Sequence, residues 1–156
     1  MIGRETELQA LASAIAAGEP LALVGEAGVG KTTLARTAVA DSGRRLMEGG
    51  ALATLSWMPY MPVARALGRA VPAGDEVHLA TVIRHAVGDG VLFLDDLHWA
   101  GRETRRLLPL LAGRLAIVAA IRSGDPTSGT ASPKSNRLAS VWSTWHHSAN
   151  PMLCPS

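Results

Sequence analysis

Apolar residues along the chain form two kinds of pattern: short uninterrupted runs, and longer segments with helical spacing. The runs predict strands at 21–25, 91–96 and 115–122, apolar on both faces as in a buried parallel sheet. Between them, apolar residues recur three or four positions apart, and this spacing predicts helices at 7–17, 32–40, 63–71, 75–87 and 103–112. The alternation of strands and helices predicts an α/β fold with a mainly parallel sheet.

The segment between the second and third predicted helices carries a weaker signal. A further strand is predicted within 44–58, either around Leu46 or around 51–55, and its register is left open. The aromatic residues of WMPYMP, Trp57 and Tyr60, are expected to pack against the core. The alternative is that they form a hydrophobic surface near a ligand or a partner.

The composition changes abruptly after Arg122. Residues 123–156 contain eight serines, four prolines and one acidic residue, without a sustained helical or strand period. We expect a single folded domain at 1–126, followed by a low-complexity, disordered tail at 127–156. Trp142 and Trp145 depart from that pattern, since bulky aromatic residues are rare in disordered segments.

Length, charge and hydropathy exclude several classes of protein. The 156 residues, 47% of them hydrophobic, are typical of one globular domain. The formal net charge of +2 does not indicate a nucleic-acid-binding surface. Neither a signal peptide nor an apolar run of about 18 residues is present, so we expect a soluble, cytoplasmic protein without a membrane span.

The segment GEAGVGKT at 25–32 matches the phosphate-loop pattern G-x-x-x-x-G-K-S/T, between a predicted strand and a predicted helix. Glycines in such a loop let backbone N–H groups approach phosphate oxygens, and the helix N-terminus adds partial positive charge. Lys31 would neutralise the β and γ phosphates of ATP, and the Thr32 hydroxyl would bind Mg²⁺. The predicted nucleotide-binding residues are Gly25, Glu26, Ala27, Gly28, Val29, Gly30, Lys31, Thr32 and Thr33.

Two adjacent carboxylates end the predicted strand at 91–96. Beside a phosphate loop, Asp95 is expected to hold Mg²⁺, usually through water, and Asp96 is a candidate for polarising the attacking water. The alternative is a solvated aspartate pair that opens a loop. Arg122 ends the last predicted strand, where it either reaches the γ phosphate or marks the surface. Lys31, Asp96 and Arg122 are the candidate catalytic residues.

Four segments together resemble a known family. They are GRETEL near the start, GEAGVGKTTLA, VLFLDDLHWA, and the hydrophobic strand that ends in arginine. They resemble the ATPase module of the signal-transduction (STAND) group of AAA-like P-loop NTPases, in particular the N-terminal ATPase domain of large LuxR-type bacterial transcriptional regulators. The resemblance extends over about residues 2–126, and DDLHWA is more specific than the phosphate loop alone.

The resemblance implies an ATP-driven switch with a three-layer fold, in which Arg122 senses the γ phosphate and Ile2, Gly3 and Arg4 lie near the adenine. It also implies a fifth strand beside the phosphate-loop strand, then a helical lid and effector domains. Neither strand nor lid is recognisable after Arg122. With the family's strand order 5-1-4-3-2, their absence would leave 21–25 as an exposed hydrophobic edge.

Three hypotheses about function follow from the sequence. The first is a Mg²⁺- and ATP-binding switch domain of a signalling or transcriptional regulator, with slow ATP hydrolysis at most. Its partners would be a second copy of the chain or an effector domain supplied elsewhere. The second is a truncated or frame-shifted remnant of such a regulator that does no chemistry. The third is a P-loop kinase for a small molecule, which would need an acceptor site and a closing lid.

Overall fold

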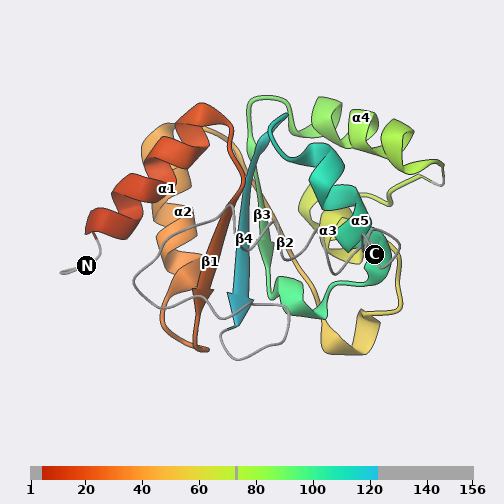
Figure 1. The fold of residues 1–156 in the computed structure, drawn as a ribbon, viewed down its shortest axis with the longest axis horizontal. Coiled ribbons are helices and arrows are strands. Elements are labelled where there is room, and N and C mark those ends of the chain that lie inside the picture. Colours follow the sequence, from red (N-terminus) through yellow and green to blue (C-terminus); the bar gives the residue numbers. More distant parts are fainter. Residues whose placement is uncertain (1–4, 73, 123–156) are drawn as a thin grey trace, which may run out of the picture.

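A computed structural model of the chain describes residues 5–72 and 74–122, which form a three-layer α/β fold (Figure 1). A central sheet lies between two groups of helices, with α1 and α2 on one face and α3, α4 and α5 on the other. The elements are α1 (Glu5–Ala17), β1 (Leu21–Gly25), α2 (Lys31–Ser42), β2 (Leu46–Gly50), η1 (Ala53–Leu55), α3 (Met61–Leu67), α4 (Glu76–Val87), β3 (Val91–Asp95), η2 (Leu97–Trp99), α5 (Arg102–Leu111) and β4 (Ala116–Arg122).

The four strands of the described sheet are all parallel and lie in the order β1-β4-β3-β2. This confirms the α/β fold with a parallel sheet and agrees with the expected positions of strands 1, 4, 3 and 2. Within the described residues, β1 pairs with β4 alone and therefore forms one edge. The expected lack of a fifth strand and a lid concerns residues outside the described ranges and stays a prediction.

Alternate residues of the strands enter two separate hydrophobic cores. Along β3, Leu92 and Leu94 pack with the α3, α4 and α5 side, whereas Val91 and Phe93 pack with α1 and α2. Both faces of the sheet are thus buried, because side chains on a strand alternate and helices cover each face. This explains why β3 and β4 show continuous apolar runs in the sequence instead of an apolar and polar alternation.

The segment between α2 and α3 resolves the strand alternatives. The strand lies at Leu46–Gly50, in register with Val91–Asp95, whereas 53–55 forms a short 3-10 helix. Helix α3 ends at Leu67, earlier than the predicted end at residue 71, because Gly68 adopts a left-handed conformation (φ 65°) that closes the helix.

Several predictions lie outside the described residues. They concern Ile2, Gly3 and Arg4, the boundary at 126, and the tail at 127–156. Among the helices of the described ranges, none combines the length and apolar character that crossing a membrane requires.

Candidate phosphate and metal site

The candidate site lies at the edge of the sheet where all four parallel strands end, at the lower end of β1 and β4 in Figure 1. In the register, Gly25 is opposite Arg122, and Asp95 is opposite Gly50. The phosphate-loop start, the carboxylate at the end of β3 and the arginine at the end of β4 are therefore at the same edge. Ligands of open parallel α/β sheets bind at this edge, because the loops diverge there.

The loop between β1 and α2 takes its shape from two glycines with positive φ. Gly28 and Gly30 have φ values of 79° and 85°, which side chains with a Cβ rarely adopt. Gly30 is also the N-cap of α2, and its position provides no side-chain hydrogen bond to the helix. The first N–H groups of α2 thus stay available for an anion, and the helix dipole favours negative charge there.

The Lys31 ammonium group lies over this loop. Its Nζ donates hydrogen bonds to the carbonyl oxygens of Gly25 (2.8 Å) and Glu26 (2.7 Å). These two bonds hold the Lys31 ammonium group at the start of the loop. Lys31 is therefore positioned to exchange a carbonyl for a phosphate oxygen without leaving the loop.

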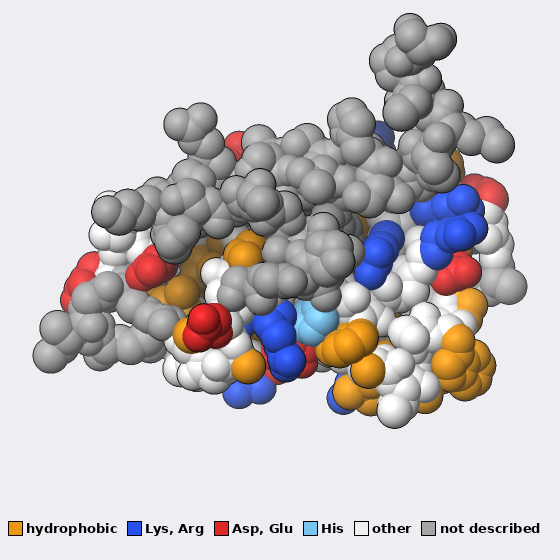
Figure 2. Space-filling view, turned by 60° about the horizontal axis from the view of Figure 1, so that its bottom comes forward, with side chains coloured by type: hydrophobic (Ala, Val, Ile, Leu, Met, Phe, Trp, Pro, Cys, Tyr) orange, Lys and Arg blue, Asp and Glu red, His pale blue; other side chains and the backbone are white. Residues whose placement is uncertain are grey.

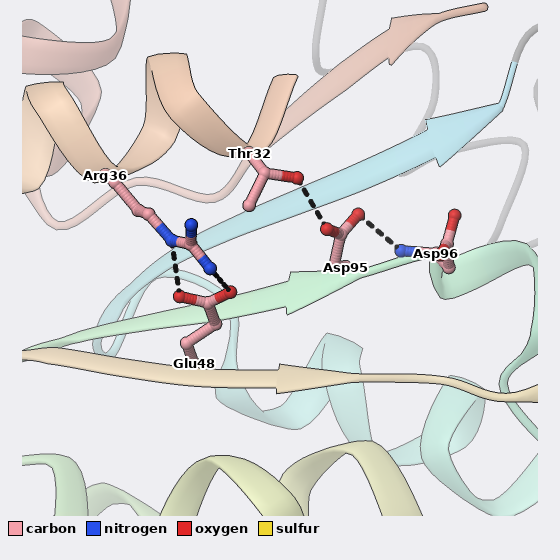
Figure 3. A network of polar contacts seen from close by, with 5 residues as sticks. All are labelled: Thr32, Arg36, Glu48, Asp95 and Asp96. Carbon is pink, nitrogen blue, oxygen red and sulfur yellow. Dashed lines mark hydrogen bonds and ion pairs between the residues drawn. The ribbon is translucent and has the colours of Figure 1, made fainter. Parts of the chain in front are cut away.

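Asp95 connects α2 to the end of β3. One of its carboxylate oxygens, Oδ2, accepts a hydrogen bond from Thr32 Oγ1 at 2.6 Å, and the other, Oδ1, accepts from the Asp96 N–H at 2.8 Å (Figure 3). The backbone carbonyl of Asp95 also accepts from the Ala51 N–H at 2.9 Å. These bonds fix the Asp95 carboxylate at the start of α2, beside the phosphate loop.

The donor set of Thr32 and Asp95 fits Mg²⁺. The ion prefers hard oxygen ligands at 2.0–2.1 Å in an octahedron, so neighbouring ligand oxygens lie about 2.9 Å apart. The hydroxyl and carboxylate oxygens are 2.6 Å apart, close to that spacing. The described residues contain no group of three or more His, Cys, Asp or Glu that could hold a metal. Mg²⁺ is usually bound through one or two carboxylates together with substrate phosphates.

Asp96 follows in a strained backbone conformation. Its φ of 49° and ψ of 39° are left-handed, and it is one of two non-glycine residues with positive φ within the described ranges. The backbone turns there into η2, where the Trp99 N–H bonds to the Asp96 carbonyl at 2.9 Å. Such strain persists where the surrounding structure imposes it, and it concentrates at functional sites. The turn separates the Asp96 side chain from the Asp95 carboxylate (Figure 3).

An ion pair that the sequence did not reveal lies beside Asp95. Arg36 Nε and Nη2 donate to the two carboxylate oxygens of Glu48, at 2.9 and 2.7 Å (Figure 3). The hydrogen bond and the charge of Glu48 raise the pKa of Arg36, and the charge of Asp95 raises it further. One signal was available: Arg36 is four residues after Thr32, on the same side of a helix. Glu48 was missed because the register of β2 was open.

Figure 2 looks onto this edge of the sheet and shows hydrophobic side chains gathered at one end of it. The large exposed hydrophobic residues near the ends of β2 and β3 are Leu52, Trp57, Met58 and Trp99. Trp57 is 73% exposed, so the expectation that it packs against the core is wrong. Tyr60 does pack against the core, and partial burial raises the pKa of its hydroxyl.

The other predicted residues are placed as follows. Arg122 is exposed at the end of β4. Glu26, Ala27 and Val29 are exposed in the loop, and Thr33 is exposed in the first turn of α2. The structure thus brings the loop, Thr32 and Asp95 together, and it places Arg122 at the same edge as Gly25.

Comparison with known proteins agrees with this geometry. The family model described as the AAA ATPase domain matches residues 1–121. A search of curated proteins found no match. The match extends over more than half of the chain and includes the phosphate loop, Asp95 and Asp96. With its parallel sheet and its phosphate loop at the carboxyl edge, the chain therefore belongs to the AAA ATPase domain family.

Proposed function

We propose that the chain binds ATP together with Mg²⁺ at the edge where β1 and β3 end. The observation that carries the proposal is the 2.6 Å contact between Thr32, at the start of the phosphate-loop helix, and Asp95, at the end of β3. It joins the two motifs at one edge of the sheet and places a hydroxyl beside a carboxylate, the kinds of oxygen that Mg²⁺ would prefer.

Each side chain has a role in this proposal. The phosphate loop and the N-terminus of α2 bind the phosphates through backbone N–H groups, and Lys31 adds its charge to the β and γ phosphates. Thr32 holds Mg²⁺ through its hydroxyl, and Asp95 holds it through water. Bound Mg²⁺ neutralises the charge that develops on the phosphates during hydrolysis. Asp96 orients the attacking water, and Arg122 contacts the γ phosphate.

We further propose that hydrolysis is slow and that the domain acts as a nucleotide switch of a signalling or transcriptional regulator. Asp96 is one carbon shorter than glutamate, so its carboxylate reaches less far toward water at the γ phosphate. A slow reaction lets the ATP state persist as a signal. The resemblance of GEAGVGKTTLA and VLFLDDLHWA to regulator ATPase modules supports the regulator role.

The proposal is tested by replacing Lys31 with alanine. We expect the affinity for a fluorescent ATP analogue with Mg²⁺ to fall by at least about 10-fold, since a charged hydrogen bond contributes roughly 1.5–3 kcal/mol. The matched control is Arg114→Ala, which removes an exposed positive charge just before the start of β4, at the opposite edge. Equal affinity of Lys31→Ala and the wild type would reject the site. No binding by the wild type would favour the remnant hypothesis.

The proposed domain boundary has its own test. A version of the chain that ends at Pro126 should bind the same nucleotide with the affinity of the whole chain, because the residues assigned to binding precede it. A large loss of affinity on shortening would show that residues 127–156 contribute to the domain.

A further inference from the structure

The Arg36–Glu48 ion pair lies beside the candidate metal site, although it belongs to neither motif. Arg36 is one helical turn after Thr32 on α2. Glu48 is on β2, two residues before Gly50, which pairs with Asp95 on β3. Since residues two apart on a strand share a face, Glu48 and the Asp95 neighbour Gly50 are on the same side of the sheet. Figure 3 shows both pairs, Thr32–Asp95 and Arg36–Glu48, side by side.

The hydrogen-bond geometry of the ion pair orients the Arg36 guanidinium toward Glu48. Both oxygens of Glu48 bind the guanidinium, through Nε and Nη2, in the planar two-bond geometry that fits a carboxylate. The third nitrogen, Nη1, points away from Glu48 (Figure 3). The Nε–Nη2 edge of the guanidinium is therefore occupied by Glu48 and does not bond to a second carboxylate.

Stability alone is a weak reason for the pair. The Arg36 side chain is 57% exposed and that of Glu48 is 28% exposed. Ion pairs at such exposure contribute little to folding, because water and salt screen the charges and both long side chains lose freedom. The position of the pair beside Asp95 therefore matters more than its contribution to stability.

An arginine this close to Asp95 would otherwise compete for it. A carboxylate that binds a guanidinium through both oxygens has fewer lone pairs left for a metal ion, and the positive charge repels the cation. The pKa of Arg36 is raised mainly by its hydrogen bond and charge interaction with Glu48; burial lowers it, and the charge of Asp95 adds a smaller raising effect. Without the charge of Glu48, Asp95 would be the remaining carboxylate whose charge raises the pKa of Arg36.

We propose that Glu48 is a positioning residue of the Mg²⁺ site. From β2 it binds the Arg36 side chain of α2, and it thereby keeps the Asp95 carboxylate available to the metal. This rests on the proposed function, since it concerns the same site. Glu48 does not itself bind the metal in this proposal. Its effect on metal binding passes entirely through Arg36.

The test compares the Mg²⁺ affinity of four proteins: the wild type, Glu48→Gln, Arg36→Gln and the double variant. Each is loaded with ADP, Mn²⁺ binding is followed by electron paramagnetic resonance, and Mg²⁺ is titrated in as competitor. We expect Glu48→Gln to weaken metal binding by about 3- to 10-fold, the scale of one close ion pair formed between Arg36 and Asp95 in water. Arg36→Gln should bind at least as tightly as the wild type, and the double variant should return to within about 2-fold of it.

Salt distinguishes a positioning effect from the general field of an extra charge. The loss in Glu48→Gln should decrease but remain measurable between about 50 mM and about 0.5 M KCl, because salt screens the exposed Arg36–Asp95 pair in part and a distant charge more completely. Unfolding midpoints of all four proteins show whether they are folded. Restored binding in the double variant is independent evidence that this variant is folded.

Three results would overturn the inference. They are wild-type metal affinity in Glu48→Gln, a loss that Arg36→Gln does not relieve, and a loss that disappears at high salt. A failure of the proposed function would look different. In that case the wild type itself would not bind the nucleotide, and adding the nucleotide would not make it bind Mn²⁺. Nucleotide binding by all four proteins with equal metal affinity would reject only the role of Glu48.

Discussion

Asp95 is the residue on which the hydrogen bonds of the candidate site converge. Its two carboxylate oxygens accept from Thr32 and from the Asp96 N–H, and its carbonyl accepts from Ala51. A side chain fixed by two bonds would lose little further freedom on receiving an ion, which would favour tight binding. The contact with Thr32 joins residues 63 positions apart, so it exists only once β3 lies beside the phosphate-loop helix.

At this scale, Asp95→Asn tests the metal site. We expect ATP to bind without its dependence on Mg²⁺, because an amide oxygen carries no full charge for the ion. The measurement is nucleotide affinity with Mg²⁺ and with a chelator present. Thr32→Ser, which keeps the hydroxyl, is the matched control and should retain the Mg²⁺ dependence. A Mg²⁺ effect of wild-type size in Asp95→Asn would contradict the assignment.

Asp96 is expected to affect hydrolysis and not binding. Replacing it by asparagine removes a carboxylate that can accept a proton from water, so any ATP turnover should fall by about 10-fold or more. Affinity for ATP with Mg²⁺ should stay within about 2-fold, because Asp95 keeps its contacts to Thr32. Single-turnover hydrolysis and equilibrium binding separate the two effects. An equal turnover in both proteins would leave Asp96 as a structural turn residue.

At the scale of elements, Gly49 explains how α3 reaches β2. A Cβ at this position would lie 2.7 Å from the backbone nitrogen of Ala66 and would also collide with the Pro62 carbonyl. Both are backbone atoms of α3, which cannot move without shifting the whole helix. The glycine therefore sets the distance between helix and strand, and with it the place of the neighbouring Glu48 and Gly50.

Replacing Gly49 with alanine should lower the free energy of unfolding by about 1–3 kcal/mol, the usual cost of forcing extra volume into a packed contact. Denaturant unfolding followed by circular dichroism measures it. Gly50→Ala is the control one residue away, because its Cβ would meet its nearest neighbours at 3.8 Å, an ordinary contact. If both variants unfolded alike, the close approach of α3 would not limit stability.

Most elements could be predicted because their signals are local. The apolar runs at β1, β3 and β4 and the phosphate loop lie within a few consecutive residues, and the structure confirms these elements at the expected places. The strand β2 could not be fixed, since LMEGG contains two glycines and one charge and its residues are only partly buried at most positions. Its place depends on pairing with β3, which is a distant contact.

At the scale of the whole molecule, both faces of the sheet are covered while its carboxyl edge carries the candidate site. The two hydrophobic cores hold β1, β3 and β4 rigidly between helices. A loop anchored by β1 at one end and by α2 at the other presents its N–H groups in nearly fixed positions. Ligand binding at this edge should therefore stabilise the fold as a unit and not only the loop.

This gives a prediction for the folded chain as a whole. At a free ATP concentration of about 100 times the dissociation constant, with Mg²⁺, binding adds about 2.7 kcal/mol to stability. The unfolding midpoint should then rise by roughly 5–10 °C for a chain of this size. Differential scanning calorimetry with increasing ATP measures the shift, and Lys31→Ala provides the comparison. An unchanged midpoint at saturating ATP would argue against binding to the folded state.

The sequence by itself determined the α/β class, the phosphate loop, and the two carboxylates at the end of a strand, because each depends on residues close together in the chain. Only the tertiary structure decided the register of β2, the exposure of Trp57, and the pairing of Arg36 with Glu48 beside Asp95. The physical reason is that packing and hydrogen bonds between elements depend on how distant segments dock. No pattern of neighbouring residues in the sequence specifies the distance and direction between two docked elements.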